Sequence, residues 1–144
     1  MALVVDASVA VRWLFDMDGV AQADALLQST EPLISPDLVF SEITNVAWKM
    51  VVFATLPAEA AAESVQKSGD FFHEIVASRE LKDAALAISV ELRHPAYDCF
   101  YLALAEQRDC QMVTADERLL ARCAKTPFAK RVRPLITAPS TRRR

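Results

Sequence analysis

Four acidic residues of this chain stand where an α/β fold would bring side chains together. Asp6 ends the apolar run at residues 3–5, and Asp116 follows a second apolar run. Glu42 and Asp98 fall near the starts of two predicted helices. Open α/β sheets place their chemistry outside the carboxyl ends of buried strands. We therefore expect these four carboxylates to meet at one edge of the sheet.

A cluster of four carboxylates indicates a bound divalent cation. Like charges at close range repel each other, and a hard cation such as Mg²⁺ or Mn²⁺ neutralises them through oxygen ligands. One or two such ions can activate water and stabilise the leaving oxygen of a phosphodiester. No histidine or cysteine is spaced for a softer metal, and we interpret His73 and His94 as structural residues away from the site. The pattern favours metal-dependent phosphodiester hydrolysis without a protein nucleophile.

Each of these residues also has a plain structural interpretation. Asp6 is a good helix cap as well as a candidate ligand, and this stretch alone supports both interpretations equally. Glu42, with Asn45 one turn beyond it, lies on a predicted helix, where a single glutamate is usually a solvated surface group. Ser8 and Thr114 each stand two residues from an acid, where a hydroxyl can hold a metal-bound water or simply cap a helix.

The elements that must position these residues alternate between strands and helices. Strands are predicted at residues 3–5, 33–35, 71–76, 111–114 and 132–136. Helices are predicted at residues 7–15, 20–28, 36–54, 57–67, 79–93 (with Ser78 as its cap), 97–105 and around 119–120. This alternation predicts an α/β domain with a short, mainly parallel sheet flanked by helices in an α/β/α arrangement.

Length and composition narrow the possibilities. The 144 residues suffice for one domain, which we assign to residues 1–137, followed by a basic, flexible tail at 138–144. Only two glycines are present, and neither the dinucleotide-binding G-x-G-x-x-G nor the P-loop motif occurs. No apolar run is long enough to span a membrane, and the N-terminus lacks the features of a signal peptide. Three cysteines without metal-finger spacing favour a reduced, cytoplasmic protein.

Charge is distributed unevenly along the chain. Residues 118–144 contain nine of the sixteen Lys and Arg residues and none of the nineteen Asp and Glu residues. A nucleic acid is one explanation, because Lys and Arg make many of the contacts to backbone phosphates. A solvated basic face with a frayed end is the other, and we favour it for Arg142, Arg143 and Arg144.

Four short blocks carry a resemblance to a known family. They are V-V-D-A-S-V at residues 4–9, S-E-I-T-N-V-A-W at 41–48, Y-D-C-F-Y-L-A-L-A at 97–105 and V-T-A-D-E-R-L at 113–119. In this order they resemble the PIN-domain family, and within it the VapC-type ribonuclease toxins of bacterial and archaeal toxin–antitoxin pairs. The resemblance covers nearly the whole chain and implies a single PIN-like domain.

The resemblance also implies roles for individual residues. The residues that match the acidic quartet of the family are Asp6, Glu42, Asp98 and Asp116. Those that match its polar helpers are Ser8, Asn45 and Thr114. The implied activity is that of an endoribonuclease in which Mg²⁺ or Mn²⁺ is held by Asp6, Asp98 and Asp116, with Glu42 as a further ligand or water-orienting base. The implied partners are RNA, a second copy in a homodimer and a cognate antitoxin that inserts into the acidic groove.

Two rival functions use the same residues. A phosphotransfer domain would use Asp6 as an aspartyl nucleophile, but the chain lacks the second acid two residues on that such enzymes use. A partner-binding module would retain the acidic pocket without turnover. Because all four acids are present, we favour the active, metal-dependent ribonuclease. Lys49 and basic residues at 118–133 are candidates for holding flanking phosphates.

Overall fold

The structure, a computed structural model, describes residues 1–136. Within them a five-stranded parallel sheet has the order β3-β2-β1-β4-β5. The strands are β1 (Leu3–Val5), β2 (Leu33–Pro36), β3 (Glu74–Val76), β4 (Gln111–Thr114) and β5 (Val132–Pro134). The helices are α1 (Ala7–Leu14), α2 (Val20–Leu27), α3 (Leu38–Ala54), α4 (Ala58–Lys67), α5 (Lys82–Leu92), α6 (Ala96–Gln107) and α7 (Glu117–Cys123).

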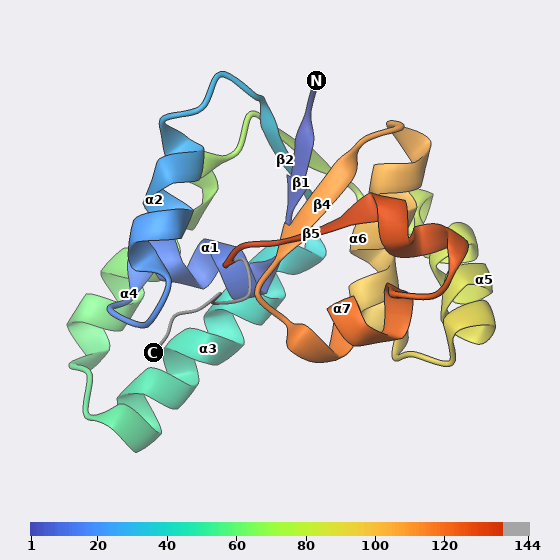
Figure 1. Ribbon diagram of the computed structural model, residues 1–144. Helices are drawn as coiled ribbons and strands as arrows, with labels where there is room; N and C mark the ends of the chain where they lie inside the picture. The colour runs from blue at the N-terminus through green and yellow to red at the C-terminus, as the bar shows by residue number, and fades with distance from the viewer. Residues whose placement is uncertain (137–144) are drawn as a thin grey trace, which may run out of the picture.

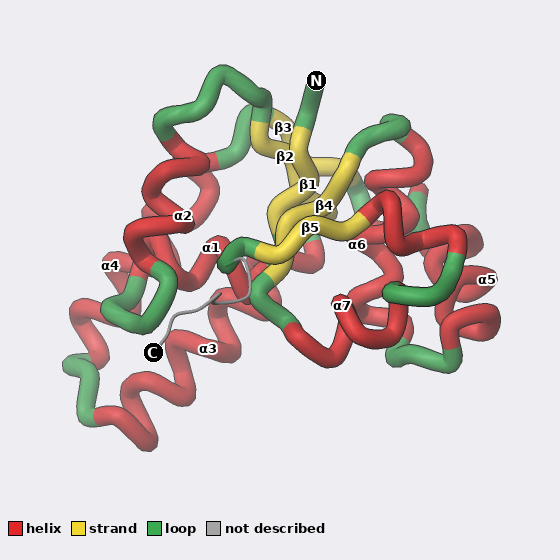
Figure 2. Tube along the Cα trace, in the orientation of Figure 1, coloured by secondary structure: helices red, strands yellow, loops and turns green. Residues whose placement is uncertain are grey.

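Helices cover both faces of the sheet. Helix α1 packs against α2 and α3, and α3 packs against α4, so these four helices lie together on one side (Figure 1). Helix α6 packs against β1, β2 and β4 from the other side, and α5 packs on α6. The strands run between these two groups of helices in Figure 2. The predicted α/β/α arrangement is confirmed, and the sheet is parallel throughout the described residues.

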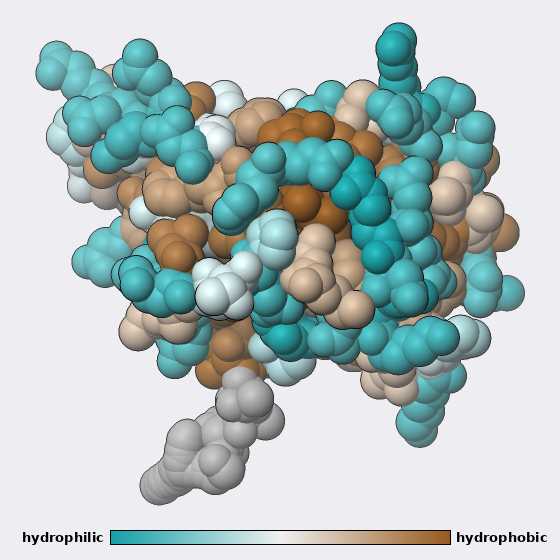
Figure 3. Space-filling view, turned by 90° about the horizontal axis from the view of Figure 1, so that it is seen from above, coloured by the Kyte–Doolittle hydropathy of each residue, from teal (hydrophilic) through white to brown (hydrophobic). Residues whose placement is uncertain are grey.

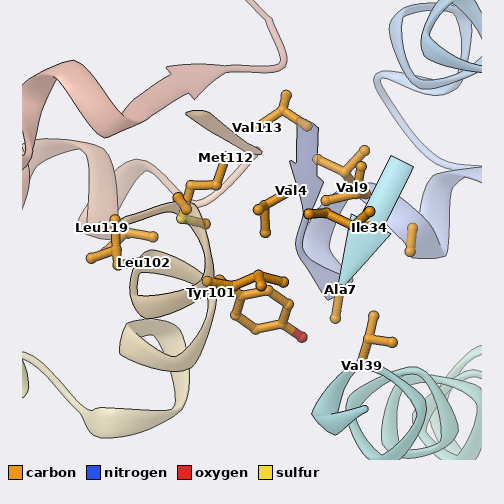
Figure 4. Packing of buried hydrophobic residues seen from close by; sticks show 14 of the residues in the cluster. Val4, Ala7, Val9, Ile34, Val39, Tyr101, Leu102, Met112, Val113 and Leu119 are labelled. Carbon is orange, nitrogen blue, oxygen red and sulfur yellow. The ribbon is translucent and has the colours of Figure 1, made fainter. Parts of the chain in front are cut away.

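Strand β1 lies at the centre of the sheet because its three residues are apolar and buried. Val4 pairs with Ile34 of β2 on one side and with Met112 of β4 on the other. Figure 4 shows these side chains within the core, above the ring of Tyr101. After β3 the chain returns to the opposite side of β1, so the strand order reverses between β1 and β4. Open α/β sheets commonly bind ligands at such a reversal.

The two acids that follow β1 and β4 begin the next helices. Asp6 is the N-cap of α1, where its carboxylate accepts a hydrogen bond from the Val9 amide at 3.2 Å. Asp116 is the N-cap of α7, and its carboxylate accepts from the amides of Arg118 and Leu119. The cap interpretation of Asp6 is therefore correct, Asp116 is a second cap, and both caps lie at the same edge of the sheet.

Several predicted boundaries are wrong in detail. The strand predicted at 132–136 ends at Pro134, and the helix predicted at 97–105 spans Ala96–Gln107. The helix predicted from residue 79 begins at Lys82, after a 3-10 turn at Ser78–Glu80. Ser78 does not cap it, because the Ser78 amide and hydroxyl both donate to the Asp37 carboxylate. Pro36 belongs to β2 rather than to the following helix. The strand predicted at 71–76 is confined to β3, and the tail predicted at 138–144 lies outside the described residues.

Three further features of the described residues concern the surface, the helices and the cysteines. Seen from above, where β1 begins, hydrophilic side chains surround a hydrophobic centre (Figure 3). None of the helices in residues 1–136 is both long enough and apolar enough to cross a membrane. Cys99, Cys110 and Cys123 are buried free thiols.

Candidate active site

Asp6 is held in place by one side chain from the start of α1 and one from the end of β4. Its Oδ1 accepts a hydrogen bond from the Ser8 hydroxyl at 2.6 Å, and its Oδ2 accepts from the Thr114 hydroxyl. The Ser8 oxygen in turn accepts from the Ala115 amide at 2.9 Å, and the Thr114 oxygen accepts from the Asp116 amide at 3.0 Å. Ser8 and Thr114 therefore join the turn after β1 to the turn after β4, and they orient the Asp6 carboxylate.

The Asp6 carboxylate is costly to ionise in this position. The residue is only 4% exposed. Burial raises the pKa of Asp6 from 3.8 to about 7, although hydrogen bonds from Ser8, Thr114 and Val9 lower it, and the charge of Asp98 raises it further. Within residues 1–136, no Lys or Arg forms an ion pair with it. A cation supplied from outside the chain would stabilise its charged form.

Asp98 lies in the first turn of α6 and has a histidine partner. Its Oδ2 lies 2.6 Å from Nε2 of His94, whose side chain is 9% exposed. The interpretation of His94 as a residue away from the site is therefore wrong. The other histidine, His73, does have a structural role, because its Nδ1 accepts a hydrogen bond from the Leu33 amide at 2.9 Å.

Glu42 reaches the site from α3 and is bound by a buried tyrosine of α6. The Tyr101 hydroxyl donates to Glu42 Oε1, and Tyr101 is 1% exposed. Figure 4 shows the Tyr101 hydroxyl pointing toward Ala7, at the start of α1, and Val39, in the first turn of α3. Burial, followed by the charge of Glu42, raises the pKa of Tyr101 well above its ordinary value, so the phenol stays protonated as a donor. Burial and the charge of Asp98 also raise the pKa of Glu42, against the effect of the Tyr101 hydrogen bond.

One pocket of about 460 Å³ brings the predicted acids together. The sequence-predicted residues that line it are Asp6, Ser8, Glu42, Asn45, Asp98 and Asp116. Thr114 is fully buried and contacts the pocket through Asp6. The acids come from four places: directly after β1 and β4, the second turn of α3 and the first turn of α6. Lys49, proposed for phosphate contacts, is exposed and does not line the pocket.

The donor atoms in this pocket suit a hard cation. Carboxylate and hydroxyl oxygens are the ligands that Mg²⁺ and Mn²⁺ prefer. Among the described residues, no three His, Cys, Asp or Glu side chains are grouped closely enough to hold a metal ion by themselves. Mg²⁺ usually keeps several waters and binds only one or two carboxylates directly. The residues present therefore fit an ion held partly through water rather than in a complete protein cage.

Sequence reasoning missed two residues of this site, and both stand on α6 or just before it. His94 precedes Asp98 by four residues, and Tyr101 follows it by three. Within a helix, residues at these spacings share one face, but α6 begins only at Ala96, after His94. That spacing could have identified both residues as members of the site, but aromatic residues at helical spacing more often belong to a hydrophobic core.

The fold and the pocket define a class of protein: an α/β domain with carboxylates gathered where its parallel sheet reverses order. Within this class, the chain belongs to the PIN domain family, whose model matches residues 3–125. The family predicted from the four sequence blocks is thus confirmed, together with its fold.

Similar proteins come from archaea and bacteria. The chain is 27% identical over 121 residues to a Pyrobaculum aerophilum protein named Ribonuclease VapC3, covering 83% of this chain and 92% of that protein. The crystal structure of PAE2754 from the same organism superposes with a TM-score of 0.70 at 25% identity, over 94% of this chain and 84% of that one. A toxin–antitoxin complex from Klebsiella pneumoniae superposes with a TM-score of 0.69 at 14% identity, covering 95% of this chain and 100% of that one, a likeness of fold.

Proposed function

We propose that this protein is an Mg²⁺- or Mn²⁺-dependent endoribonuclease that acts as the toxin of a type II toxin–antitoxin pair. The observation that carries the proposal is the gathering of four carboxylates in one pocket, where no Lys or Arg within residues 1–136 forms an ion pair with Asp6, Glu42 or Asp116. The similarity to a protein named a VapC ribonuclease supports RNA as the substrate.

The acidic residues of the pocket would have different roles in the reaction. Asp6, Asp98 and Asp116 would hold the cation, directly or through water. When bound, the cation supplies charge that activates water and stabilises the leaving oxygen of a phosphodiester. Glu42 would orient the attacking water or accept its proton, and Tyr101 holds the Glu42 carboxylate for that task.

The remaining residues preserve this geometry. Ser8 and Thr114 fix both oxygens of Asp6, and Asn45 offers an amide at the pocket wall. Because both Asp6 oxygens accept hydrogen bonds and the residue is buried, Asp6 is poorly placed to attack a phosphoryl group. This weakens the aspartyl-nucleophile alternative.

Two protein partners and a location complete the proposal. A cognate antitoxin is supported by the toxin–antitoxin complexes among the structures with this fold. A homodimer is supported by two exposed apolar residues one turn apart on α5, Leu86 and Val90, which a second copy would cover. A cytoplasmic location is supported by the three free, buried cysteines, as expected in a reducing compartment.

The test of the proposed activity is cleavage of purified RNA with added Mg²⁺ or Mn²⁺. We expect cleavage with either ion, complete loss on addition of EDTA, and recovery with excess Mg²⁺. A beryllofluoride adduct on Asp6 would instead support the phosphotransfer alternative. Tight metal binding without any cleavage would support the non-catalytic module.

Replacing Tyr101 with phenylalanine tests the task of Glu42. The change removes the hydrogen bond that lowers the pKa of Glu42, so that pKa should rise further. We expect cleavage to fall about tenfold near neutral pH and the acidic limb of the kcat profile to move to higher pH. Stability should fall by about 1 kcal/mol, because a buried hydrogen bond is lost.

The matched control is Tyr97→Phe, which removes a hydroxyl from an exposed tyrosine of the same pocket. It should leave the acidic limb of the profile in place. If the Tyr101 variant has the same pH profile as the native protein, Glu42 does not act in the catalytic step.

A further inference from the structure

A second, smaller hollow adjoins the active-site pocket. Its volume is about 160 Å³, and its lining residues are His94, Pro95, Asp98, Asp116, Arg118 and Arg122. Asp98 and Asp116 line both spaces, so the pocket and the hollow meet at these two carboxylates. The mechanism proposed above gives no task to the two arginines.

Arg118 and Arg122 stand one turn apart on α7 and therefore share one face of that helix. Neither guanidinium forms an ion pair within the part of the chain that the structure describes. By contrast, Arg108, Arg131 and Arg133 each lie within 3.5 Å of a glutamate carboxylate. Two guanidinium groups that form no ion pair can attract an anion from outside to this hollow, once the charges of Asp98 and Asp116 are balanced.

We propose that Arg118 and Arg122 together bind the RNA phosphate next to the one that is cleaved. The inference rests on the proposed nuclease function, which puts the cleaved phosphate against Asp98 and Asp116. The neighbouring phosphate of the same strand then falls at the hollow that shares these carboxylates. Guanidinium groups present planar, paired N–H donors that match phosphate oxygens. The arginine pair thereby positions the strand across the pocket.

The carboxylates in the hollow couple this phosphate to the cation. Without a cation, Asp98 and Asp116 repel a phosphate bound beside them. A divalent ion at the pocket removes that repulsion, so RNA and the ion strengthen each other's binding. The Asp116 carboxylate keeps its cap on α7 by accepting from the Arg118 amide, which leaves the Arg118 side chain available.

The test compares two double variants for RNA binding without cleavage. Arg118→Gln/Arg122→Gln is compared with Arg79→Gln/Lys82→Gln, which removes the same charge from exposed residues outside both spaces. Both pairs are placed in an Asp6→Asn background to stop cleavage. Fluorescence anisotropy of a labelled single-stranded RNA is measured in Mg²⁺ over a range of KCl concentrations.

We expect the α7 variant to bind RNA on the order of tenfold or more weakly than its parent and than the control pair. The slope of log K against log salt should become shallower by about 0.7, the contribution of one phosphate on a single strand. The Mg²⁺-induced rise in melting temperature, measured with native Asp6, should persist in the α7 variant.

Unchanged RNA affinity and slope in the α7 variant would overturn the inference and favour an acidic protein segment as the occupant. An equal loss of RNA affinity in the control pair would also overturn it, because the affinity would then depend only on the net charge of the protein. Failure of the native protein to cleave RNA would refute the nuclease proposal separately, because the binding comparison does not depend on turnover.

Discussion

Replacing Asp98 with asparagine is expected to lower RNA cleavage by about a thousandfold or more while the fold stays intact. Asp98 is the one carboxylate whose charge acts on both Asp6 and Glu42. If the proposed mechanism holds, its loss removes a cation ligand, and cation catalysis contributes several kcal/mol to the transition state. Each 1.36 kcal/mol corresponds to a factor of ten in rate. Asparagine keeps the shape of the side chain and can still hydrogen-bond to His94.

The measurement is single-turnover cleavage of RNA with purified protein, beside thermal unfolding. The matched control is Glu91→Gln, which makes the same change of acid to amide on the exposed surface of α5. It should cleave at the native rate. Native cleavage by the Asp98 variant would show that the site has been assigned to the wrong residues.

The stability of the metal-free protein is expected to fall as the pH rises from about 4 to about 7. Asp6 has a pKa of about 7 in the folded protein against 3.8 as the ordinary value. Between these values the folded state binds one more proton than the unfolded state, so the free energy of unfolding decreases with pH. The difference between the two pKa values corresponds to a loss of about 4 kcal/mol in the free energy of unfolding once Asp6 is fully ionised. The expected drop in melting temperature is on the order of 10 °C.

Mg²⁺ should reverse this loss, because it stabilises the charged carboxylate. We expect the ion to raise the melting temperature more at pH 8 than at pH 5. Asp6→Asn supplies the control: it should flatten the pH dependence and weaken the response to Mg²⁺. If the native protein and this variant show the same pH dependence, burial of Asp6 is not what governs it.

The sequence predicted the sheet and its acids well because the relevant signals are local. Asp6 and Asp116 each follow a short buried strand and begin a helix, and both features can be recognised within a few residues. The parallel sheet followed from the alternation of strands and helices. The predicted boundaries of the elements were less accurate. Serine is a favoured helix cap, but Ser78 instead donates a hydrogen bond to Asp37, which lies 41 positions earlier.

The missed parts of the site depend on contacts between distant elements. Tyr101 meets Glu42 across 59 positions, because α6 and α3 approach the same edge of the sheet from opposite faces. Nothing in the neighbourhood of either residue specifies that contact. His94 lies only four positions from Asp98, but Pro95 stands between His94 and the helix. For this reason the sequence did not predict the contact between His94 and Asp98.

The pairing of β1 with β4 has a consequence for how the protein is made. Val5 lies beside Val113, so the floor of the pocket joins the beginning of the polypeptide to a stretch near its end. A ribosome must therefore synthesise most of the chain before the pocket can assemble. A product terminated before residue 111 contains Asp6 and Glu42 but lacks the strand that brings Thr114 to them. Early termination of translation would thus release a fragment in which the pocket cannot form.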